Sequence, residues 1–580
     1  MKQLTNRDIA RVLRETAAFY AMDDVPFKPR AYENAALAIQ NAQEESAELY
    51  ARGGKEALDT IPGVGKAIAL HIETLIKTGT FPEYQKMKKK MPIALDELVA
   101  VEGVGPKMVK TLWQKLKVRN LKDLEAAARA GKIGALPGFG EQSEKKILAG
   151  IMFLKKSSGR GPLGFALSYI RELEDRIRAF PGITKLMIGG SVRRRKETIG
   201  DIDILATAGN SRRVMEQFVH LPQVEHVYDM GPTKTNVRLK NGLDADIRIV
   251  PDKSWGAVLN YFTGSKQHNI ALRKMALKKG WNLSEYGLFK NKKFIGGRTE
   301  EELYKKLGLR YIEPELREMH GELEASRANK LPKLIGYNDL WGDLQVQTNK
   351  TDGEHSIEEM ALAAEKAGLA YIAITDHTKS LAVTRGLNEK KLLRQIKEIE
   401  GINSTFKARN SKFKILAGAE VNVKKDGTLD IEDAVLQKLA VVGAAVHSHF
   451  ELSRTEQTKR IICAMENPNV DIIFHLTTRI IGKRDAIKLD IDAIIAAAKR
   501  TGTVLEIDAY PDRLDIADEY VRKCVAVGVR MSIDSDAHST EHFAYLPLGI
   551  AQARRGWAEK KDIVNAWPLK KMLSMLKKSV

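Results

Sequence analysis

Seven short apolar segments between residues 336 and 580 each end in polar side chains, and stretches with helical periodicity separate them. This arrangement restricts the fold, because strands that alternate with helices form parallel sheets, and a closed β/α barrel brings the carboxyl ends of its strands to one rim. The polar ends lie at residues 343–347, 374–377, 419–420, 446–449, 474–475, 505–508 and 535–538. The pattern predicts a (β/α)7-type barrel whose rim carries side chains of the kinds that bind metal ions.

Acidic residues alternate with apolar ones in two further segments upstream of the barrel. Asp201 and Asp203 flank an isoleucine, so both carboxylates point to one face of a strand, and Asp246 lies in a second alternating segment. Carboxylate oxygens suit Mg²⁺, and two such ions can stabilise the attacking and leaving oxygens of a phosphoryl transfer. The three aspartates predict a nucleotidyl-transfer site.

A glycine turn precedes these aspartates. Gly189, Gly190 and Ser191 let the backbone approach a phosphate closely at the start of a helix, where free N–H groups favour anions. Taken alone, a glycine turn is more often only a turn, and paired aspartates are more often a solvated strand face. Their combination favours phosphoryl transfer.

Further motifs follow in a fixed order. They are the segment 261–265, with the sequence Tyr-Phe-Thr-Gly-Ser, then Asn269, Arg273 and the pair at 285–286, Glu-Tyr. Together with the aspartates and the glycine turn, they resemble DNA polymerase family X over roughly residues 1 to 335. The resemblance implies a template-directed polymerase that uses Mg²⁺ or Mn²⁺ and acts on gapped or nicked DNA and dNTPs.

The same resemblance implies residue roles. Asp201, Asp203 and Asp246 correspond to the catalytic metal-binding triad, with Asp246 placed to help activate the primer 3′-hydroxyl. Tyr261 and Phe262 correspond to the segment that packs against the incoming sugar, and Asn269 and Arg273 correspond to minor-groove contacts with nucleotide and template. Gly190, Ser191 and Arg194 correspond to the triphosphate cradle. The implied nucleotide-binding residues are Gly190, Ser191, Arg194, Gly200, Tyr261, Phe262, Gly264, Asn269 and Arg273.

Residues 1–155 show helical periodicity throughout, and a glycine motif recurs in them at 61–66, 101–107 and 136–140. These copies resemble helix-hairpin-helix elements, whose turns expose backbone N–H groups to a phosphate without reading bases. The first two copies predict DNA binding through Gly63, Gly65, Lys66, Gly103, Gly105 and Lys107. The third lacks a lysine until Lys145, so a plain helix connection also fits it.

In family members that excise a 5′-deoxyribose phosphate, a lysine on the helix after the first hairpin forms a Schiff base. His71 takes that position here, and an imidazole cannot form the same stable imine. The lyase activity of those family members therefore lacks its usual nucleophile at this position, while Lys28 and Tyr32 remain candidates for a 5′-phosphate pocket.

The polar strand ends of the barrel resemble the PHP family of phosphoesterases, which holds three metal ions. The corresponding ligands are Asp352, His377, Glu420, His447, His475, Asp536 and His538. Gln345 and Gln347 replace the His-x-His pair of the first strand, and an amide oxygen is a poor substitute for imidazole toward Zn²⁺ or Mn²⁺. We expect incomplete occupancy by Mn²⁺ or Zn²⁺ and a 3′-to-5′ exonuclease activity that is weakened or lost.

The composition agrees with an anionic partner. Lysine and arginine outnumber acidic residues by 94 to 74, which gives a net charge of +20 and favours nucleic acid. No apolar run is long enough to span a bilayer, and no signal-peptide core follows Met1, so we expect a cytoplasmic monomer without a membrane partner. Both cysteines, Cys463 and Cys524, have apolar neighbours and are predicted to be core residues.

The predicted fold class is therefore a multidomain α and α/β chain. A helical helix-hairpin-helix domain spans 1–155, a nucleotidyltransferase palm with thumb and fingers spans 156–314, a linker spans 315–335, and the PHP barrel spans 336–580. Three alternatives remain open. The barrel could supply the main activity as a 3′-end nuclease or phosphatase, it could act only as a scaffold, or the triad could serve template-independent nucleotide addition.

Overall fold

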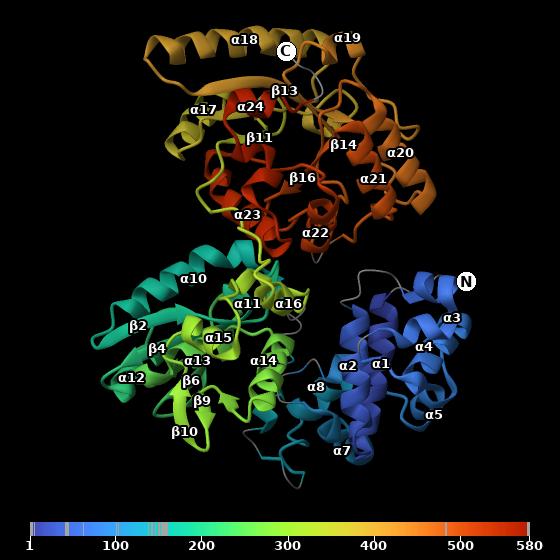
Figure 1. Cartoon of the computed structure of the whole chain (residues 1–580), viewed down its shortest axis with the longest axis vertical. Helices are drawn as coiled ribbons and strands as arrows, with labels where there is room; N and C mark the ends of the chain where they lie inside the picture. The colour runs from blue at the N-terminus through green and yellow to red at the C-terminus, as the bar shows by residue number, and fades with distance from the viewer. Residues whose placement is uncertain are drawn as a thin grey trace. The chain divides into compact units, whose positions relative to one another are not determined.

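The computed structural model describes residues 4, 6–40, 46–61, 63–99, 101, 104–136, 139–140, 143–145, 147–148, 151, 160–481 and 484–576. The chain forms two compact units, Met1–Arg160 and Gly161–Val580. Figure 1 colours them from blue at the N-terminus to red at the C-terminus. Among the described residues, no helix has the length and apolar character needed to cross a membrane.

The first unit is helical in all its described elements, as predicted. Its helices are α1 (Asn6–Met22), α2 (Lys28–Gln40), α3 (Ser46–Asp59), α4 (Lys66–Thr78), α5 (Pro82–Lys90), α6 (Leu95–Val99), α7 (Pro106–Leu116) and α8 (Leu121–Arg129). They enclose a single apolar cluster that includes Leu13, Ile39, Ile72 and Val109. Glycines set the ends of α4, since Gly65 is its extended N-cap and Gly79 is its left-handed C-cap.

The second unit begins with a mixed sheet of five strands in the order β2-β4-β7-β6-β5. Its elements are β1 (Gly161–Pro162), α10 (Leu163–Arg178), β2 (Ile183–Ile188), α11 (Gly190–Arg193), β3 (Thr198–Ile199), β4 (Asp201–Ala208), α12 (Ser211–Val219), β5 (Val224–Met230), β6 (Lys234–Leu239) and β7 (Asp244–Ile249). The isoleucines that alternate with the aspartates, including Ile202, Ile204 and Ile247, are buried in one cluster with residues of α10 and α12. Burial of this face turns the acidic face outward.

A smaller subdomain follows the palm sheet. It contains η1 (Asp252–Ser254), α13 (Trp255–Thr263), α14 (Lys266–Lys278), β8 (Asn282–Ser284), β9 (Gly287–Lys290), β10 (Lys293–Gly296), α15 (Glu300–Leu307), η2 (Pro314–Leu316) and α16 (Glu322–Arg327). The segment 315–335, predicted as a linker, packs into its apolar cluster through Leu316 and Leu323. One of its charges is neutralised within the subdomain, because the fully buried Arg317 donates NH1 to Glu300 Oε1 at 2.6 Å.

The remaining residues form the barrel, whose seven strands run parallel in chain order from β11 to β17. The strands are β11 (Gly342–Val346), β12 (Tyr371–Ile374), β13 (Lys414–Asn422), β14 (Val441–Ala445), β15 (Ile472–Ile473), β16 (Val504–Asp508) and β17 (Met531–Asp534). The helices are α17 (Ile357–Lys366), η3 (Ala382–Thr384), α18 (Glu389–Ala408), α19 (Asp433–Leu436), α20 (Arg454–Glu466), α21 (Ile491–Thr501), α22 (Asp518–Val527), η4 (Thr540–Tyr545), α23 (Leu546–Arg555), η5 (Lys560–Asp562), η6 (Val564–Ala566) and α24 (Leu569–Leu573). The predicted β/α alternation is confirmed.

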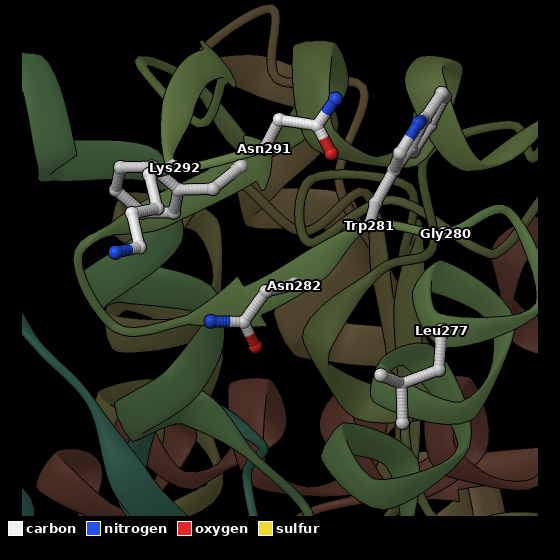
Figure 2. A pocket seen from close by; sticks show the side chains of 7 residues that line it. Leu277, Gly280, Trp281, Asn282, Asn291 and Lys292 are labelled. Carbon is white, nitrogen blue, oxygen red and sulfur yellow. The ribbon is translucent and has the colours of Figure 1, made fainter.

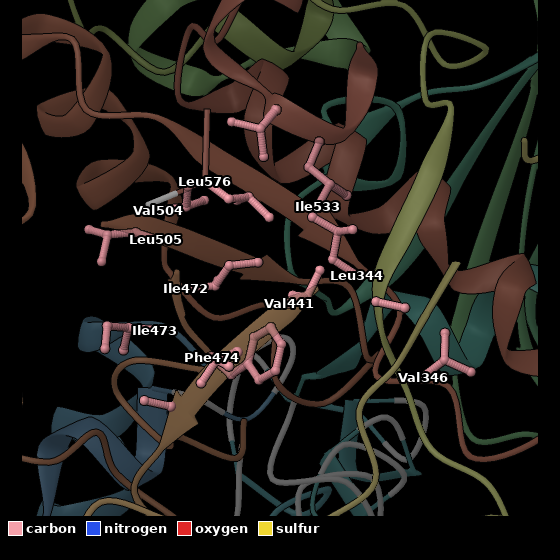
Figure 3. Packing of buried hydrophobic residues seen from close by; sticks show 14 of the residues in the cluster. Leu344, Val346, Val441, Ile472, Ile473, Phe474, Val504, Leu505, Ile533 and Leu576 are labelled. Carbon is pink, nitrogen blue, oxygen red and sulfur yellow. The ribbon is translucent and has the colours of Figure 1, made fainter. Parts of the chain in front are cut away.

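The ends of the barrel sheet meet just beyond β17. Gln347 N donates to Ala537 O at 2.8 Å, and Ala537 N donates to Gln345 O at 3.3 Å, so β11 pairs with the segment after the last strand. Figure 3 shows buried hydrophobic residues of one cluster, among them Leu344, Val441, Ile472, Leu505 and Ile533, which come from β11 and from β14 to β17. This near closure brings all seven strand ends to one rim.

The expectation for the two cysteines is half wrong. Cys524 is buried in α22, and burial raises the pKa of its thiol to about 12. Cys463 is exposed on α20, although its sequence neighbours Ile462 and Ala464 are apolar. A helix turns by 100° per residue, so apolar neighbours along the chain do not decide which face a residue occupies.

Candidate nucleotidyl-transfer site and barrel metal centre

Two adjacent parallel strands carry the predicted triad. The register of β4 and β7 pairs Asp203 directly with Asp246 and pairs Asp201 with Asp244. Asp201 is exposed, while Asp203 and Asp246 are half-buried. The structure therefore brings the three predicted carboxylates to one face near the amino ends of both strands.

The carboxylates perturb one another strongly. Burial, together with the negative charges of Asp201 and Asp246, raises the pKa of Asp203 to about 7. Two cations stand at the edge of the cluster, because Lys234 Nζ and Arg248 NH2 each lie 3.7 Å from Asp246 Oδ2. A cluster of hard oxygens with excess negative charge fits a divalent cation of the Mg²⁺ type.

The glycine turn lies directly against this cluster. Gly190 has a φ of +58°, and a Cβ built on it would approach Asp203 Oδ2 to 2.3 Å. The N–H of Gly189 donates to Asp203 O at 2.7 Å, which ties the turn to β4. Ser191 follows in α11, and Gly200 separates β3 from β4. Only glycine allows the turn to sit this close to the acidic residues.

The predicted sugar and minor-groove residues also come together. Asn269 Nδ2 donates to Tyr261 O at 2.6 Å, and the Arg273 guanidinium lies 5.1 Å from the centroid of the Tyr261 ring. Phe262 meets Tyr261 edge to face at 5.0 Å and lies under the Arg248 guanidinium at 4.6 Å. These contacts join α13, α14 and β7 beside the triad.

Arg194, predicted to bind the triphosphate, already has protein partners. Its Nε donates to Glu318 Oε1 at 2.9 Å, and its NH1 donates to Thr263 O. Gly264 leaves room for it, since a Cβ there would lie 3.0 Å from Arg194 NH1. Glu318 escaped the sequence analysis because it lies far along the chain inside the predicted linker.

The pocket shown in Figure 2 lies on the small subdomain and has a volume of about 620 Å³. Its walls are Leu277, Gly280, Trp281, Asn282, Phe289, Asn291 and Lys292. None of the predicted site residues lines it, so we assign it no part in the chemistry.

One backbone hydrogen bond recurs in the three glycine motifs of the first unit. In each, an N–H closes the turn: Val64 to Ile61 O at 2.9 Å, Val104 to Val101 O at 3.0 Å, and Phe139 to Leu136 O at 3.0 Å. This likeness extends to the third copy, despite its lack of a nearby lysine.

The predicted phosphate-binding groups of the first two copies are accessible. Gly63, Gly65, Lys66, Gly105 and Lys107 are all exposed, and Lys107 pairs with Asp24. The sixth residue of that prediction, Gly103, lies outside the described residues.

A polar cluster surrounds His71. Tyr32 is buried and its hydroxyl lies 2.6 Å from His71 Nδ1, while His71 Nε2 lies 3.3 Å from Glu83 Oε2. Burial lowers the pKa of His71, so the imidazole is neutral at pH 7. The predicted pocket residues Lys28 and Tyr32 both lie on α2, and exposed Lys28 covers the Tyr20 ring of α1 at 4.7 Å.

In the barrel, Glu420 is the centre of the predicted metal cluster. It is fully buried, and its carboxylate lies 3.0 Å from His447 Nε2 and 2.8 Å from His475 Nε2. Burial favours the neutral acid, but His377, His447 and His475 hold the pKa of Glu420 well below its ordinary value. Glu420, His377 and His447 have ligand atoms close enough to share a cation.

A second group of ligand type adjoins the first. Asp352, His377 and His538 bring ligand atoms within 4.8 Å of one another. Burial opposes protonation of His377, but the Glu420 and Asp352 carboxylates raise its pKa to about 9. Imidazole and carboxylate donors in this arrangement fit Mn²⁺ or Zn²⁺.

Gln345 and Gln347 do not act as a pair of metal ligands in this structure. Gln347 Nε2 donates to Glu420 Oε2 at 2.7 Å, and Gln345 Nε2 donates to the same oxygen at 3.3 Å. Both side chains are fully buried, and their Oε1 atoms have no hydrogen-bond partner within the described part of the chain. Amide N–H groups that face the carboxylate do not fit a cation at this position.

Asp536, the remaining predicted ligand, faces a guanidinium. Arg513 Nε lies 3.5 Å from Asp536 Oδ2 and 3.5 Å from Asp508 Oδ2. Arg513 was not predicted from the sequence, because it lies in the loop beyond the end of β16 at Asp508 and no motif marks it.

Not every polar strand end joins these groups. Asp376 accepts hydrogen bonds from Thr348, Thr351 and Gln395 and organises the adjacent loop. His449 is exposed, with a positive φ of 56°.

Family models match four parts of the chain. They are a helix-hairpin-helix domain at 4–81, a SAM-like helix-hairpin-helix tandem at 95–152, a DNA polymerase beta thumb at 258–318 and a PHP domain at 343–545. The matches cover the first unit, the small subdomain and most of the barrel.

Some curated relatives match only part of the chain, and another matches nearly all of it. A probable phosphatase of Thermoanaerobacter sp. (strain X514) is 32% identical over 209 residues, which are 34% of this chain and 78% of that protein. DNA polymerase lambda of Rattus norvegicus is 26% identical over 288 residues, which are 44% of this chain and 47% of that protein. The DNA polymerase/3′-5′ exonuclease PolX of Bacillus subtilis (strain 168) is 35% identical over 578 residues, 99% of both chains. The chain therefore belongs to the family X DNA polymerases that carry a C-terminal PHP domain.

Proposed function

We propose that this chain is a template-directed DNA polymerase that fills short gaps in DNA repair. One observation carries the proposal: Asp201, Asp203 and Asp246 converge on adjacent strands, and the pKa of Asp203 is raised to about 7 by burial and by the two other carboxylates. Such a cluster is poised to exchange protons for divalent cations. The relative that spans the whole chain is named as a DNA polymerase.

Each group around the triad then has a task. Mg²⁺ or Mn²⁺ held by the three aspartates would supply the charge that stabilises the attacking and leaving oxygens of an in-line phosphoryl transfer. Asp246 would accept the proton of the primer 3′-hydroxyl. The backbone of Gly190 and Ser191 would donate to the triphosphate.

The residues on α13 and α14 would select the nucleotide. Tyr261 and Phe262 offer ring faces and edges to the sugar, and Asn269 and Arg273 lie beside them for contacts in the minor groove. In the first unit, exposed Lys66 and Lys107 would hold the phosphates of gapped or nicked DNA. We expect the protein to act as a monomer.

The test is single-nucleotide addition to a labelled primer on a one-nucleotide gap. Asp246→Asn should lower the rate of addition by on the order of 10³, because a carboxylate that binds cations is lost. Its control is Asp229→Asn, a change of the same kind at an exposed position of β5 in the same sheet. Both variants should bind gapped DNA as the wild type does, and extension by Asp246→Asn at the wild-type rate would refute the proposal.

A second function, 3′-to-5′ exonuclease activity in a weakened form, is supported by the barrel. The PolX relative is named for both activities. Here Gln345 and Gln347 donate hydrogen bonds to Glu420, and the described residues of the barrel offer two groups that fit cations, which share His377, rather than three. The residues that would hold Mn²⁺ or Zn²⁺ are Glu420, His447, His475, Asp352, His377 and His538.

Metal analysis distinguishes a barrel with a weakened metal site from one with a complete site. An Asp201→Asn, Asp203→Asn, Asp246→Asn variant removes the polymerase ligands, so the ions that remain belong to the barrel. Two ions per chain would agree with the proposal. Three ions together with strong exonuclease activity would mean that the glutamines do not weaken the site.

A further inference from the structure

Two arginines of the barrel hold the loop that follows the glycine turn. This loop, residues 194–197, connects α11 to β3. Arg555, the last residue of α23, donates NH1 to the carbonyl oxygen of Arg194 at 3.1 Å. Arg479 donates NH2 to Glu197 Oε2 at 2.7 Å at the other end of the loop. Between them the backbone turns sharply, since Arg195 has a φ of 54°.

The same arginine shares the carboxylate that orients Arg194. Glu318 Oε1 accepts from Arg194 Nε at 2.9 Å and from Arg555 NH1 at 3.2 Å. Arg555 NH2 donates to Asp518, on α22 of the barrel. The result is a continuous chain of ion pairs from the barrel helices to the nucleotide-binding turn.

These connected ion pairs are shielded from solvent. The exposed fraction is 2% for the Arg555 side chain and 15% for those of Arg194 and Glu318. Burial opposes ionisation of Glu318, but Lys196, Arg555 and Arg194 lower its pKa to about 2, so it is charged at neutral pH. Partly buried charges interact strongly and are costly to leave without a partner.

The sharing of Glu318 matters for Arg194. A carboxylate paired with Arg194 alone would neutralise the charge that a triphosphate needs. With Arg555 on the same oxygen and Lys196 nearby, the cluster has three cations against the carboxylates of Glu318 and Asp518. Arg194 is thereby fixed in orientation while the cluster keeps a positive excess.

We propose that Arg555 of the barrel is a positioning residue for nucleotide addition, which holds Arg194 and its loop in the geometry that binds the triphosphate of the incoming dNTP. This inference rests on the proposed function, in which Arg194 contacts the triphosphate. The PHP barrel then supports the polymerase site through its structure, whether or not it hydrolyses phosphoesters.

The experiment is steady-state addition of one nucleotide to gapped DNA by the full chain, with the dNTP concentration varied. Arg555→Ala should raise the KM for dNTP by about tenfold, with a smaller change in kcat and unchanged affinity for the gapped DNA, because orientation of the triphosphate is lost. Loss of DNA affinity with unchanged KM would overturn the proposal.

Arg554→Ala is the matched control. Arg554 lies on the same helix and joins the same parts of the chain, but it contacts Glu315 at 2.7 Å and Ile335 O at 2.9 Å rather than Arg194 or Glu318. Its KM for dNTP should stay within about twofold of the wild type. An equal rise in both variants would mean that any loosening of this interface has the same effect, which contradicts a specific role of Arg555.

Arg194→Ala separates the two levels of the argument. No rise in KM in Arg194→Ala would defeat the proposed role of Arg194 itself, whereas a rise there without one in Arg555→Ala would defeat only the present inference. In the double variant, KM should equal that of Arg194→Ala, since Arg555 acts through Arg194.

Asp518→Asn keeps the inference testable if Arg555→Ala does not fold. The change is isosteric, and it weakens the barrel anchor of Arg555 without touching Arg194. It should raise KM by about threefold, because one charged partner of Arg555 is lost. An unchanged KM in a folded Asp518→Asn variant would overturn the inference.

Discussion

The acidic residues of the palm and those of the barrel differ in what surrounds them. Asp203 faces two other carboxylates, which raise its pKa, whereas Glu420 faces three histidines and two amide groups, and the histidines hold its pKa low. A carboxylate among carboxylates lacks positive charge, but one among imidazoles and N–H donors already has partners. The presence of acidic residues therefore does not by itself indicate how strongly a site binds metal, because the neighbouring groups decide whether their charge already has partners.

The largest effect should come from filling the space between the glycine turn and the triad. A Cβ added by Gly190→Ala would lie 2.3 Å from Asp203 Oδ2 and would therefore displace the carboxylate. We expect the rate of nucleotide addition to fall by on the order of 10³, while the free energy of unfolding changes by only about 1–2 kcal/mol.

The control for this change is Gly209→Ala. Gly209 follows β4, and a Cβ there meets no atom within 4 Å. Its rate should match that of the wild type. A fully active Gly190→Ala variant would show that the turn and the triad do not need their close approach.

A second prediction concerns the barrel alone. Gln345→His with Gln347→His replaces two donors to Glu420 by imidazoles that can bind a cation. We expect one additional Mn²⁺ or Zn²⁺ per chain and an increase of about 100-fold in primer shortening, by analogy with the size of ligand-shell effects. Metal analysis and a shortening assay measure the two results.

His447→Ala in the doubly substituted background should remove the gain, because it deletes a neighbour of Glu420. If shortening increased without additional bound metal, the glutamines would act by some route other than ligand replacement. Nucleotide addition should be unchanged in both variants, since the palm residues are untouched.

A smaller effect should appear as a pH dependence. The pKa of Asp203 is about 7 when folded, against an ordinary value of 3.8. Below pH 7 the carboxyl is protonated and competes with metal, so affinity for Mg²⁺ at the palm should fall about tenfold per pH unit from 7 to 5. Calorimetric titration of Mg²⁺ at pH 6, 7 and 8 measures this, and equal affinity at all three would contradict it.

The raised pKa of Asp203 also makes the stability of the metal-free protein depend on pH. Because the folded pKa is raised, the folded state binds a proton that the unfolded state does not, between about pH 4 and pH 7. The contribution of Asp203 is therefore fully present below pH 4 and is lost as the pH rises through 7. Asp203→Asn should remove this part of the pH dependence.

Sequence patterns predicted which groups come together wherever local periodicity or strand topology decides the arrangement. The alternation at 201–203, the turn at 189–191 and the polar ends of the barrel strands all predicted groups that the fold brings together. Periodicity settles which face of a strand a residue occupies, and parallel topology settles which ends meet.

The remaining features depend on contacts between distant segments. Glu318 and Arg555 reach Arg194 from far along the chain, and the hydrogen bonds from Gln345 and Gln347 to Glu420 require the closed barrel. The segment 315–335 was predicted as a linker, and its contacts with the small subdomain, such as that of Arg317 with Glu300, have no signal in the local sequence. Such pairings have no local signal, because side chains far apart in sequence become neighbours only through tertiary packing.

The most direct measurement follows one labelled primer on a one-nucleotide gap in the presence of Mn²⁺, scored for both lengthening and shortening. It compares the wild type with Asp246→Asn and His447→Ala. We predict that the wild type adds one nucleotide without appreciable shortening of the primer. Asp246→Asn should neither add a nucleotide nor shorten the primer, and His447→Ala should still add one nucleotide. Strong shortening that persists in Asp246→Asn and disappears in His447→Ala would contradict these predictions, because the barrel would then be an effective nuclease despite its glutamines.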